Sequence, residues 1–263
     1  MTQILSHLVQ ALASGGVEVV DLTQTLTEDF PAIVLPPEFA QPAPVRIERL
    51  SRYDAAGPAW YWNNLSFGEH TGTHFDAPAH WFTGRDNAHG TVDTMPAEDM
   101  IAPACVLDHS AECAADDDFL LTKDHILAWE GNHGRIPRGA WVLMRSGWSN
   151  RRGATYANLR EDGAHTPGPD AEAMRFLVEE RGILGFGTET IGTDAGQGGH
   201  FTPPYPAHHY LHGAGRYGLQ CLTGLDRLPA TGAVILAAPL KVHEGSGSPL
   251  RVLALVPGKG GAA

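Results

Sequence analysis

The sequence predicts a single α/β domain whose core is a mixed β-sheet, or a β-barrel-like sheet, flanked by helices. Three observations support this prediction. Strand-like runs outnumber helix-like runs, and the helix-like runs are scattered among the strands. Hydrophobic residues make up 43% of the 263 residues, which is enough for one sizeable core. No period of roughly 20–50 residues repeats and no low-complexity linker divides the chain, so we expect one domain over residues 1–263.

Three segments have the apolar spacing and the end signals of helices. They are residues 2–14, 123–132 and 171–181. Thr2, Thr122 and Asp170 stand at the starts of these segments, where a side-chain oxygen can accept a hydrogen bond from a free backbone N–H. Gly182 follows the third segment and suits the left-handed conformation in which helices often end.

The remaining pattern is strand and loop. Short runs rich in β-branched and aromatic residues predict strands at 17–22, 45–50, 61–67, 104–108, 141–145, 183–186, 233–240 and 250–256. Five prolines lie between residues 23 and 44, which excludes a long helix or a central strand there. We therefore expect this segment to be an extended arm that carries Phe30 and Phe39. A glycine-rich tail at 258–263 is expected to be frayed.

Charge and cysteine content exclude several functions. The chain has 18 Lys and Arg against 30 Asp and Glu, a formal net charge of −12, which disfavours binding to nucleic acids or to anionic membranes. The three cysteines form no CxxC pair, so neither a disulfide framework nor a cysteine zinc site is indicated. No apolar run is long enough to span a bilayer, and the first residues lack the basic stretch of a secretory signal. We expect a cytoplasmic protein.

The segment from residue 70 to residue 80 concentrates metal-ligand chemistry. It contains His70, His74, Asp76 and His80, with a glycine and a proline between them. In an extended piece, His74 and Asp76 point to the same side, and Gly72 allows a bend that brings His70 to join them. Two neutral imidazoles and one carboxylate form a site that leaves coordination positions open, as catalytic metals require. The alternative is a histidine-rich loop whose rings only make hydrogen bonds.

The run HTGTHFDAPAHW resembles the HxGTHxDxPxH motif of the cyclase family of metal-dependent hydrolases, which includes isatin hydrolases and bacterial kynurenine formamidases. The segments VEVVDLT, IGTDAGQ and PPYPAHHYLH extend the resemblance to the isatin hydrolases over nearly the whole chain. The resemblance implies the swivelling β/β/α fold of that family and a homodimer. It also implies one divalent metal, manganese favoured and zinc possible, on His70, His74 and Asp76, with His80 as general acid/base.

A second block separates the subgroups. By the same resemblance, kynurenine formamidases hold a second zinc with a His and a Glu twelve residues later, whereas this chain has His208 and then Gln220. A neutral amide neutralises a second dication poorly, so the sequence favours one metal. His208 is then free to orient the substrate or to relay protons, and Asp194 is expected to support a histidine.

These features together predict the hydrolysis of a cyclic amide by an activated water, with isatin opened to isatinate as the first choice. A flat, isatin-like small molecule needs apolar walls, for which the candidates are Trp81, Phe30 and Phe39. Trp60 and Trp62 are further candidates, although ordinary core packing is an alternative for each of these rings and the favoured one for all but Trp81. The competing hypotheses are an arylformamidase acting on N-formylkynurenine, a metal-dependent lyase or dehydratase, and a non-enzymatic metal-binding module.

Overall fold

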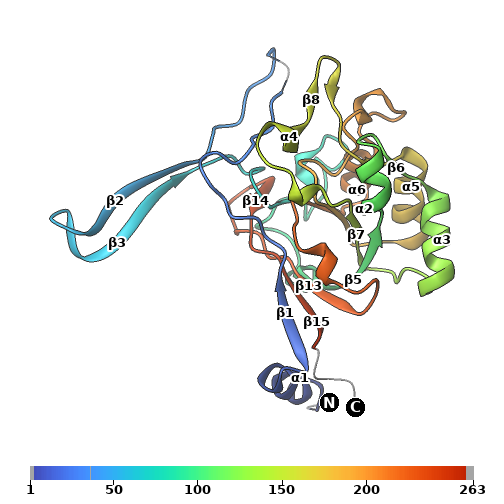
Figure 1. Cartoon of the computed structure of the whole chain (residues 1–263), viewed down its shortest axis with the longest axis horizontal. Helices are drawn as coiled ribbons and strands as arrows, with labels where there is room; N and C mark the ends of the chain where they lie inside the picture. Colours follow the sequence, from blue (N-terminus) through green and yellow to red (C-terminus); the bar gives the residue numbers. More distant parts are fainter. Residues whose placement is uncertain (1–2, 36, 259–263) are drawn as a thin grey trace.

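The protein is built on one curled, mixed sheet of nine strands (Figure 1). The computed structural model describes residues 3–35 and 37–258. The cap predicted at Thr2 and all but the first residue of the tail predicted at 258–263 lie outside the described residues. In spatial order the strands are β1 (Val17–Asp21), β15 (Leu253–Pro257), β13 (Ala233–Leu236), β5 (Ile101–Asp108), β7 (Trp141–Arg145), β11 (Gly185–Thr188), β12 (Tyr217–Gln220), β4 (His74–Asp76) and β14 (Gly247–Pro249).

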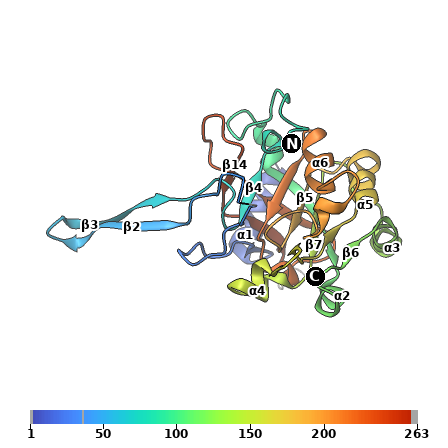
Figure 2. The same cartoon turned by 90° about the horizontal axis from the view of Figure 1, so that it is seen from above.

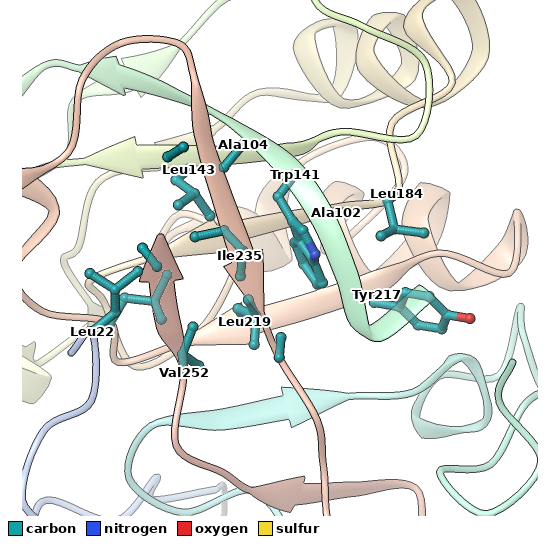
Figure 3. Packing of buried hydrophobic residues seen from close by; sticks show 14 of the residues in the cluster. Leu22, Ala102, Ala104, Trp141, Leu143, Leu184, Tyr217, Leu219, Ile235 and Val252 are labelled. Carbon is teal, nitrogen blue, oxygen red and sulfur yellow. The ribbon is translucent and has the colours of Figure 1, made fainter. Parts of the chain in front are cut away.

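The four central strands β5, β7, β11 and β12 are parallel, and the strands on both sides of them are antiparallel. Alternate residues of a strand point to opposite faces, so this sheet separates two hydrophobic clusters. On the concave face Trp141, Leu143, Tyr217 and Leu219 pack with Ile235 (Figure 3). The predicted single α/β domain with a mixed, partly barrel-like sheet is confirmed as a half-barrel.

Helices cover the other face of the sheet (Figure 1). They are α3 (Lys123–His133), α5 (Ala171–Arg175), which continues as a π-helix at Phe176–Arg181, and α6 (Pro206–Gly213). Thr122 caps α3, where its side chain accepts a hydrogen bond from the His125 amide. Asp170 caps α5 through the Ala173 amide, and Gly182 ends the π-helix with a φ of 63°. These caps confirm the predicted ends, because the start of a helix needs partners for its free N–H groups and its end needs partners for its free carbonyl groups.

A two-stranded hairpin projects from the body of the molecule (Figures 1 and 2). It consists of β2 (Arg46–Asp54) and β3 (Gly57–Ser66), which pair antiparallel with two irregularities in register. Helix α1 (Gln3–Ser14) also lies outside the core, next to β1, and none of its residues is buried. Both elements therefore leave apolar side chains exposed to solvent.

Short elements connect the main ones. These are the β6 (Leu120–Leu121) and β10 (Gly168–Pro169) pair, the β8 (Leu159–Arg160) and β9 (Gly163–Ala164) pair, α2 (Ser110–Ala115), α4 (Ala154–Ala157), and the single-turn helices Pro78–His80, Ala97–Met100, Trp148–Asn150, Gly198–His200 and Leu225–Arg227. None of the helices among the described residues combines the length and apolarity needed to cross a membrane.

Several predicted boundaries need correction. The strand expected at 233–240 stops at Leu236, shortly before Pro239, which has no N–H for a ladder. The strand expected at 250–256 begins only at Leu253, and residues 183–184 precede β11 rather than form it. The expected list lacked β12 and α6. The first is a four-residue strand with a glycine, and the second is a histidine-rich helix in a proline-rich run, so neither has a strong local signal.

Candidate active site

Strand β4 places His74 and Asp76 at one side of the sheet. Between them Phe75 points into the concave core, where its ring lies against Trp141 and Tyr217. Because side chains alternate along a strand, this anchor directs the two neighbours to the opposite side. His74 is held in place by its Nδ1, which donates to the carbonyl oxygen of Gly72 at 2.7 Å. Its other nitrogen, Nε2, lies 3.5 Å from Asp76 Oδ1.

The loop before β4 brings His70 to the same carboxylate. His70 Nδ1 is 2.6 Å from Asp76 Oδ1. The chain bends at Gly72, whose φ is +63°. A Cβ added at this position would lie 2.9 Å from the side chain of Leu26. A larger residue at position 72 would therefore be both strained and crowded. The structure thus brings His70, His74 and Asp76 together as the sequence predicted.

The single-turn helix Pro78–His80 carries His80 back over this cluster. The ring centroid of His80 is 3.8 Å from that of His70 and 5.5 Å from that of His208. Trp81 follows directly, with its ring centroid 4.9 Å from His208. The indole Nε1 of Trp81 is buried and has no hydrogen-bond partner among the described residues. A donor in this position is available to a bound molecule.

Helix α6 supplies His208, and Asp194 fixes it. Asp194 accepts hydrogen bonds from the backbone N–H of Ala207 at 2.6 Å and from Nδ1 of His208 at 2.5 Å. The other ring nitrogen, Nε2, is then directed towards Asp76 Oδ2, 3.7 Å away. The predicted support of a histidine by Asp194 has this geometry.

Gln220 lies on β12, directly opposite His74 on β4. Its side-chain N–H donates to Asp76 Oδ2, and its buried carbonyl oxygen Oε1 has no partner among the described residues. The amide therefore occupies the side of Asp76 that also faces His208. A glutamate could not donate this hydrogen bond.

Burial and charge set the protonation of the cluster. Burial raises the pKa of Asp76, but the charges of His80 and His70 outweigh it and hold this pKa well below its usual range. Burial lowers the pKa of His74 to about 4 and that of His80 to about 3, against the opposing charge of Asp76. Burial also lowers the pKa of His208, yet the hydrogen bond to Asp194 outweighs it and the pKa is raised. At neutral pH the ionised carboxylate of Asp76 therefore lies beside the neutral imidazoles of His74 and His80.

This donor set fits a divalent cation. The ligand atoms of His70, His74 and Asp76 all lie within 4.8 Å of one another. Two imidazoles and a carboxylate match the ligands that manganese and zinc accept, and three protein ligands leave positions for water and substrate. Asp76, His80 and His208 form a second group within the same limit. Because Gln220 already donates to Asp76 on that side, the second group lacks another anionic ligand.

The other predicted aromatic residues are spread out. Phe30 packs edge-on against Tyr156, with ring centroids 5.9 Å apart, and both line a cavity of about 450 Å³ that none of the histidines lines. Phe39 is 58% exposed on the arm. Trp60 and Trp62 lie on β3 of the projecting hairpin. Among the described residues, the ring contacts of the histidine cluster therefore include Trp81 but none of these four.

Sequence reasoning missed three polar residues at the cluster. Ser246 and Glu69 are hydrogen-bonded to each other, and Ser246 also contacts His70. His212 is fully buried on α6, donates from Nδ1 to the carbonyl oxygen of Arg216, and keeps a buried Nε2 without a partner among the described residues. Burial lowers the pKa of His212 to about 4. The only local signals were the Gly-Ser-Gly run around Ser246 and the one-turn spacing of His212 from His208.

Comparison with known proteins identifies the family of this chain. Residues 20–195 match the model of the Cyclase family. The isatin hydrolase of Roseibium aggregatum is 51% identical over 256 residues, which cover 96% of this chain and 97% of that protein. The structure of isatin hydrolase A from Labrenzia aggregata bound to benzyl benzoate is 64% identical, has a TM-score of 0.95, and is matched over 96% of this chain and 99% of its own. An isatin hydrolase bound to the product analogue thioisatinate is 50% identical, with a TM-score of 0.96 and coverage of 98% and 99%.

A half-barrel sheet with a cluster of two histidines and one aspartate that could hold a metal ion fits a metal-dependent hydrolase. The chain belongs to the cyclase family of such hydrolases, and over almost its full length it is similar to isatin hydrolases.

Proposed function

We propose that this protein hydrolyses a cyclic amide and that isatin, opened to isatinate, is its substrate. The observation that carries the proposal is the position of the His80 ring, whose centroid lies 3.8 Å from that of His70 beside the candidate metal ligands. The similarity to an isatin hydrolase bound to thioisatinate supports the choice of substrate. The arylformamidase alternative is less well supported, because Gln220 stands where a second metal would need a carboxylate.

We further propose one divalent ion per chain, manganese in preference to zinc, on His70, His74 and Asp76. The low pKa of Asp76 and the neutral state of His74 keep the ligand atoms free of protons at neutral pH. Such an ion, when bound, lowers the pKa of a water molecule and polarises a substrate carbonyl.

In this mechanism His80 moves the protons. With its pKa lowered to about 3 by burial, its ring is neutral at pH 7 and can accept a proton on a ring nitrogen from the attacking water. The C–N bond of the amide then breaks as the same nitrogen of His80 returns the proton to the leaving amide nitrogen. One water is consumed, the product carries a new carboxylate and a free amine, and one proton is released to the solvent.

Trp81 and His208 bind the substrate in this proposal. The Trp81 ring lies 4.9 Å from His208, so the two rings can form adjacent walls beside His80. Asp194 keeps His208 oriented and favours its charged form, which suits an oxygen that gains negative charge during the reaction. The assignment of Phe30 and Phe39 to the substrate walls stays a prediction.

The test measures metal content and two activities on one sample. We expect about one manganese per chain and a loss of isatin absorbance far faster than the loss of N-formylkynurenine absorbance. A fully manganese-loaded protein without activity on isatin would refute the substrate. Faster turnover of N-formylkynurenine would favour the arylformamidase.

We also propose a homodimer that uses the projecting hairpin. The chain exposes 13692 Å² of surface, whereas a compact monomer of this mass exposes about 11,100 Å². The side chains of Trp60, Trp62 and Leu65 on β3 are 49%, 56% and 61% exposed. Because an isolated two-stranded ribbon is marginally stable in water, a hairpin with these exposed rings is better explained by burial against another surface.

Charge favours a second copy as that surface. Arg46, Arg49 and Arg52 are exposed on β2 together with Glu48 and Asp54, which gives the strand a net charge of +1, while the chain as a whole has a net charge of −12. A basic strand on an acidic molecule is complementary to another copy of the same acidic molecule, and a twofold axis allows each hairpin to reach the other body.

Light scattering after size exclusion tests this interface. We expect a mass of twice 28.1 kDa for the wild type, and a monomer for the double variant Trp60→Ser/Trp62→Ser. Leu240→Ser is the matched control, since Leu240 is 58% exposed but lies outside the hairpin. A wild type that is monomeric at micromolar concentration would refute the dimer. The cytoplasmic location expected from the sequence stays a prediction.

A further inference from the structure

The structure assigns Ser246 and Glu69 to a hydrogen-bond relay that sets which nitrogen of His70 faces the metal. This inference rests on the proposed metal site and goes beyond it, because it names positioning residues outside the ligand set. The relay runs from His70 through Ser246 to Glu69, with successive distances of 2.9 and 2.7 Å, while Nδ1 on the opposite side of the His70 ring lies 2.6 Å from Asp76 Oδ1.

The two nitrogens of His70 have different partners. Nδ1 faces Asp76 Oδ1, the same oxygen that His74 Nε2 approaches. Nε2 is 2.9 Å from the hydroxyl oxygen of Ser246, on the other side of the ring. The nitrogen that can bind a cation together with His74 and Asp76 is therefore Nδ1. Nε2 is then the nitrogen that forms a hydrogen bond with Ser246.

Glu69 decides the direction of the hydrogen bonds. Its carboxylate oxygen Oε2 accepts from the Ser246 hydroxyl at 2.7 Å and from the Ser246 backbone N–H at 3.2 Å. Because the hydroxyl proton is directed to Glu69, the Ser246 oxygen meets His70 with a lone pair and accepts the proton on Nε2. This arrangement leaves Nδ1 without a proton, as a metal ligand must be. In the reverse tautomer Nε2 of His70 carries no proton, so the Ser246 hydroxyl would have to donate to it. The Ser246 oxygen and the Glu69 carboxylate would then be two acceptors in contact with no proton between them.

The chain around Ser246 is shaped for this contact. A Cβ at Gly247 would lie 2.5 Å from His70 Cε1, and a Cβ at Gly245 would lie 3.1 Å from Glu69 Oε1 and 2.9 Å from a methyl group of Val92. Glycine on both sides of the serine therefore allows the turn to approach both the ring and the carboxylate. The turn is also tied to the histidine motif, because the Ala77 N–H donates to the Ser246 carbonyl oxygen at 2.9 Å.

Metal affinity, measured by competition with a chelator for Mn²⁺ and Co²⁺, tests the relay independently of turnover. We expect Ser246→Ala to weaken binding by about 10–100-fold and to change the visible spectrum of the Co²⁺ protein. Glu69→Gln keeps the size of the side chain and an oxygen acceptor, so we expect a smaller loss of the same kind. The matched control is Ser248→Ala, which removes a buried hydroxyl two residues away that bonds to Leu240 and Pro249 and not to His70.

The outcomes are distinct. The relay is supported if Ser246→Ala and Glu69→Gln bind the metal more weakly than the wild type, while Ser248→Ala binds it normally. The metal-free variants must also melt close to the temperature of the metal-free wild type, so that a loss of metal affinity is not a loss of folding. Wild-type affinity in Ser246→Ala, or an equal loss in Ser248→Ala, would overturn it while the metal site stands. A wild type that binds none of these ions would instead refute the metal site that the relay serves.

Discussion

Replacing Gln220 by glutamate should convert the proposed one-metal site into a two-metal site. In the present chain the Gln220 amide donates to Asp76 Oδ2 and is almost completely buried. Gln220→Glu exchanges this donor for a second carboxylate beside Asp76 and close to His208. Asp76 Oδ2, the carboxylate introduced on β12 and His208 Nε2 then offer two anionic ligands and one imidazole, which is a complete donor set for a second Zn²⁺.

Without the second metal, this substitution should be costly. Loss of a hydrogen bond to a charged group destabilises a fold by about 1.5–3 kcal/mol, and leaving a buried carboxylate against another carboxylate raises the total to about 3–5 kcal/mol. For a chain of this length that loss lowers the melting temperature by roughly 10 °C. Zinc at about 100 times its dissociation constant should return about 2.7 kcal/mol.

Metal analysis and thermal melts with and without zinc measure both effects. We expect two metals per chain in Gln220→Glu, one in the wild type, and a zinc-dependent recovery of stability in the variant alone. Gln220→Leu loses the hydrogen bond but cannot bind a cation, so it should stay destabilised in zinc. Gln24→Glu is the matched control, because Gln24 donates to Tyr156 and to the Cys221 carbonyl rather than to Asp76. One metal per chain in Gln220→Glu, together with wild-type stability of the metal-free variant, would show that Gln220 does not control occupancy.

Three further substitutions test the site and its surroundings. His80→Ala should keep its metal and lower kcat by about 10²–10⁴-fold, measured by isatin loss, and near-wild-type turnover would exclude the proton-transfer role. Asp194→Asn should lower the pKa of His208 and reduce kcat by about tenfold or more, visible as a shifted pH profile of activity. Hydrogen bonds to Asp162 and then Asp118 raise the pKa of His165 above 6.5, so its contribution to stability is present below pH 6.5 and is lost as the pH rises through the folded-state pKa. Urea unfolding at pH 6 and pH 8 should therefore show a smaller pH dependence in His165→Asn, and an unchanged dependence would exclude this contribution.

The fold class and the strongest elements could be predicted because their signals are local. The strand at 141–145 has the predicted bounds, since it is a continuous apolar run buried on both faces. The caps at Thr122 and Asp170 are also as predicted. The nine-stranded order could not be predicted, because β4 is three residues long and pairs with strands far away in the sequence. No periodicity is measurable over three residues.

The arm and hairpin show a different limit. The prolines between residues 23 and 44 predicted that no long helix forms there, and residues 23–35 and 37–44 contain no helix. Pro36 lies outside the described residues. The aromatic residues of this region are candidates for a substrate pocket from their type alone, with core packing as the alternative. Phe39 and Trp62 are more than half exposed in the single chain, so neither is packed in its core. Residue type indicates that a side chain needs an apolar partner, but not whether that partner belongs to the same chain.

The candidate site consists of a local motif, which the sequence predicts, and of residues distant in the sequence, which it does not. His70, His74, Asp76 and His80 fall within 11 residues, so their spacing alone indicates a metal. The groups that tune them come from the other end of the chain, since Gln220 is 144 residues from Asp76 and Ser246 is 176 residues from His70. They meet because β4 lies between β12 and β14, two strands from the last quarter of the sequence. A buried carboxylate and a buried imidazole must have hydrogen-bond partners, so a short motif always requires such residues without specifying them. The proposed metal site and relay therefore predict that two members of this family with the same HxxxHxD motif differ in metal number where β12 differs and in metal affinity where the turn before β14 differs.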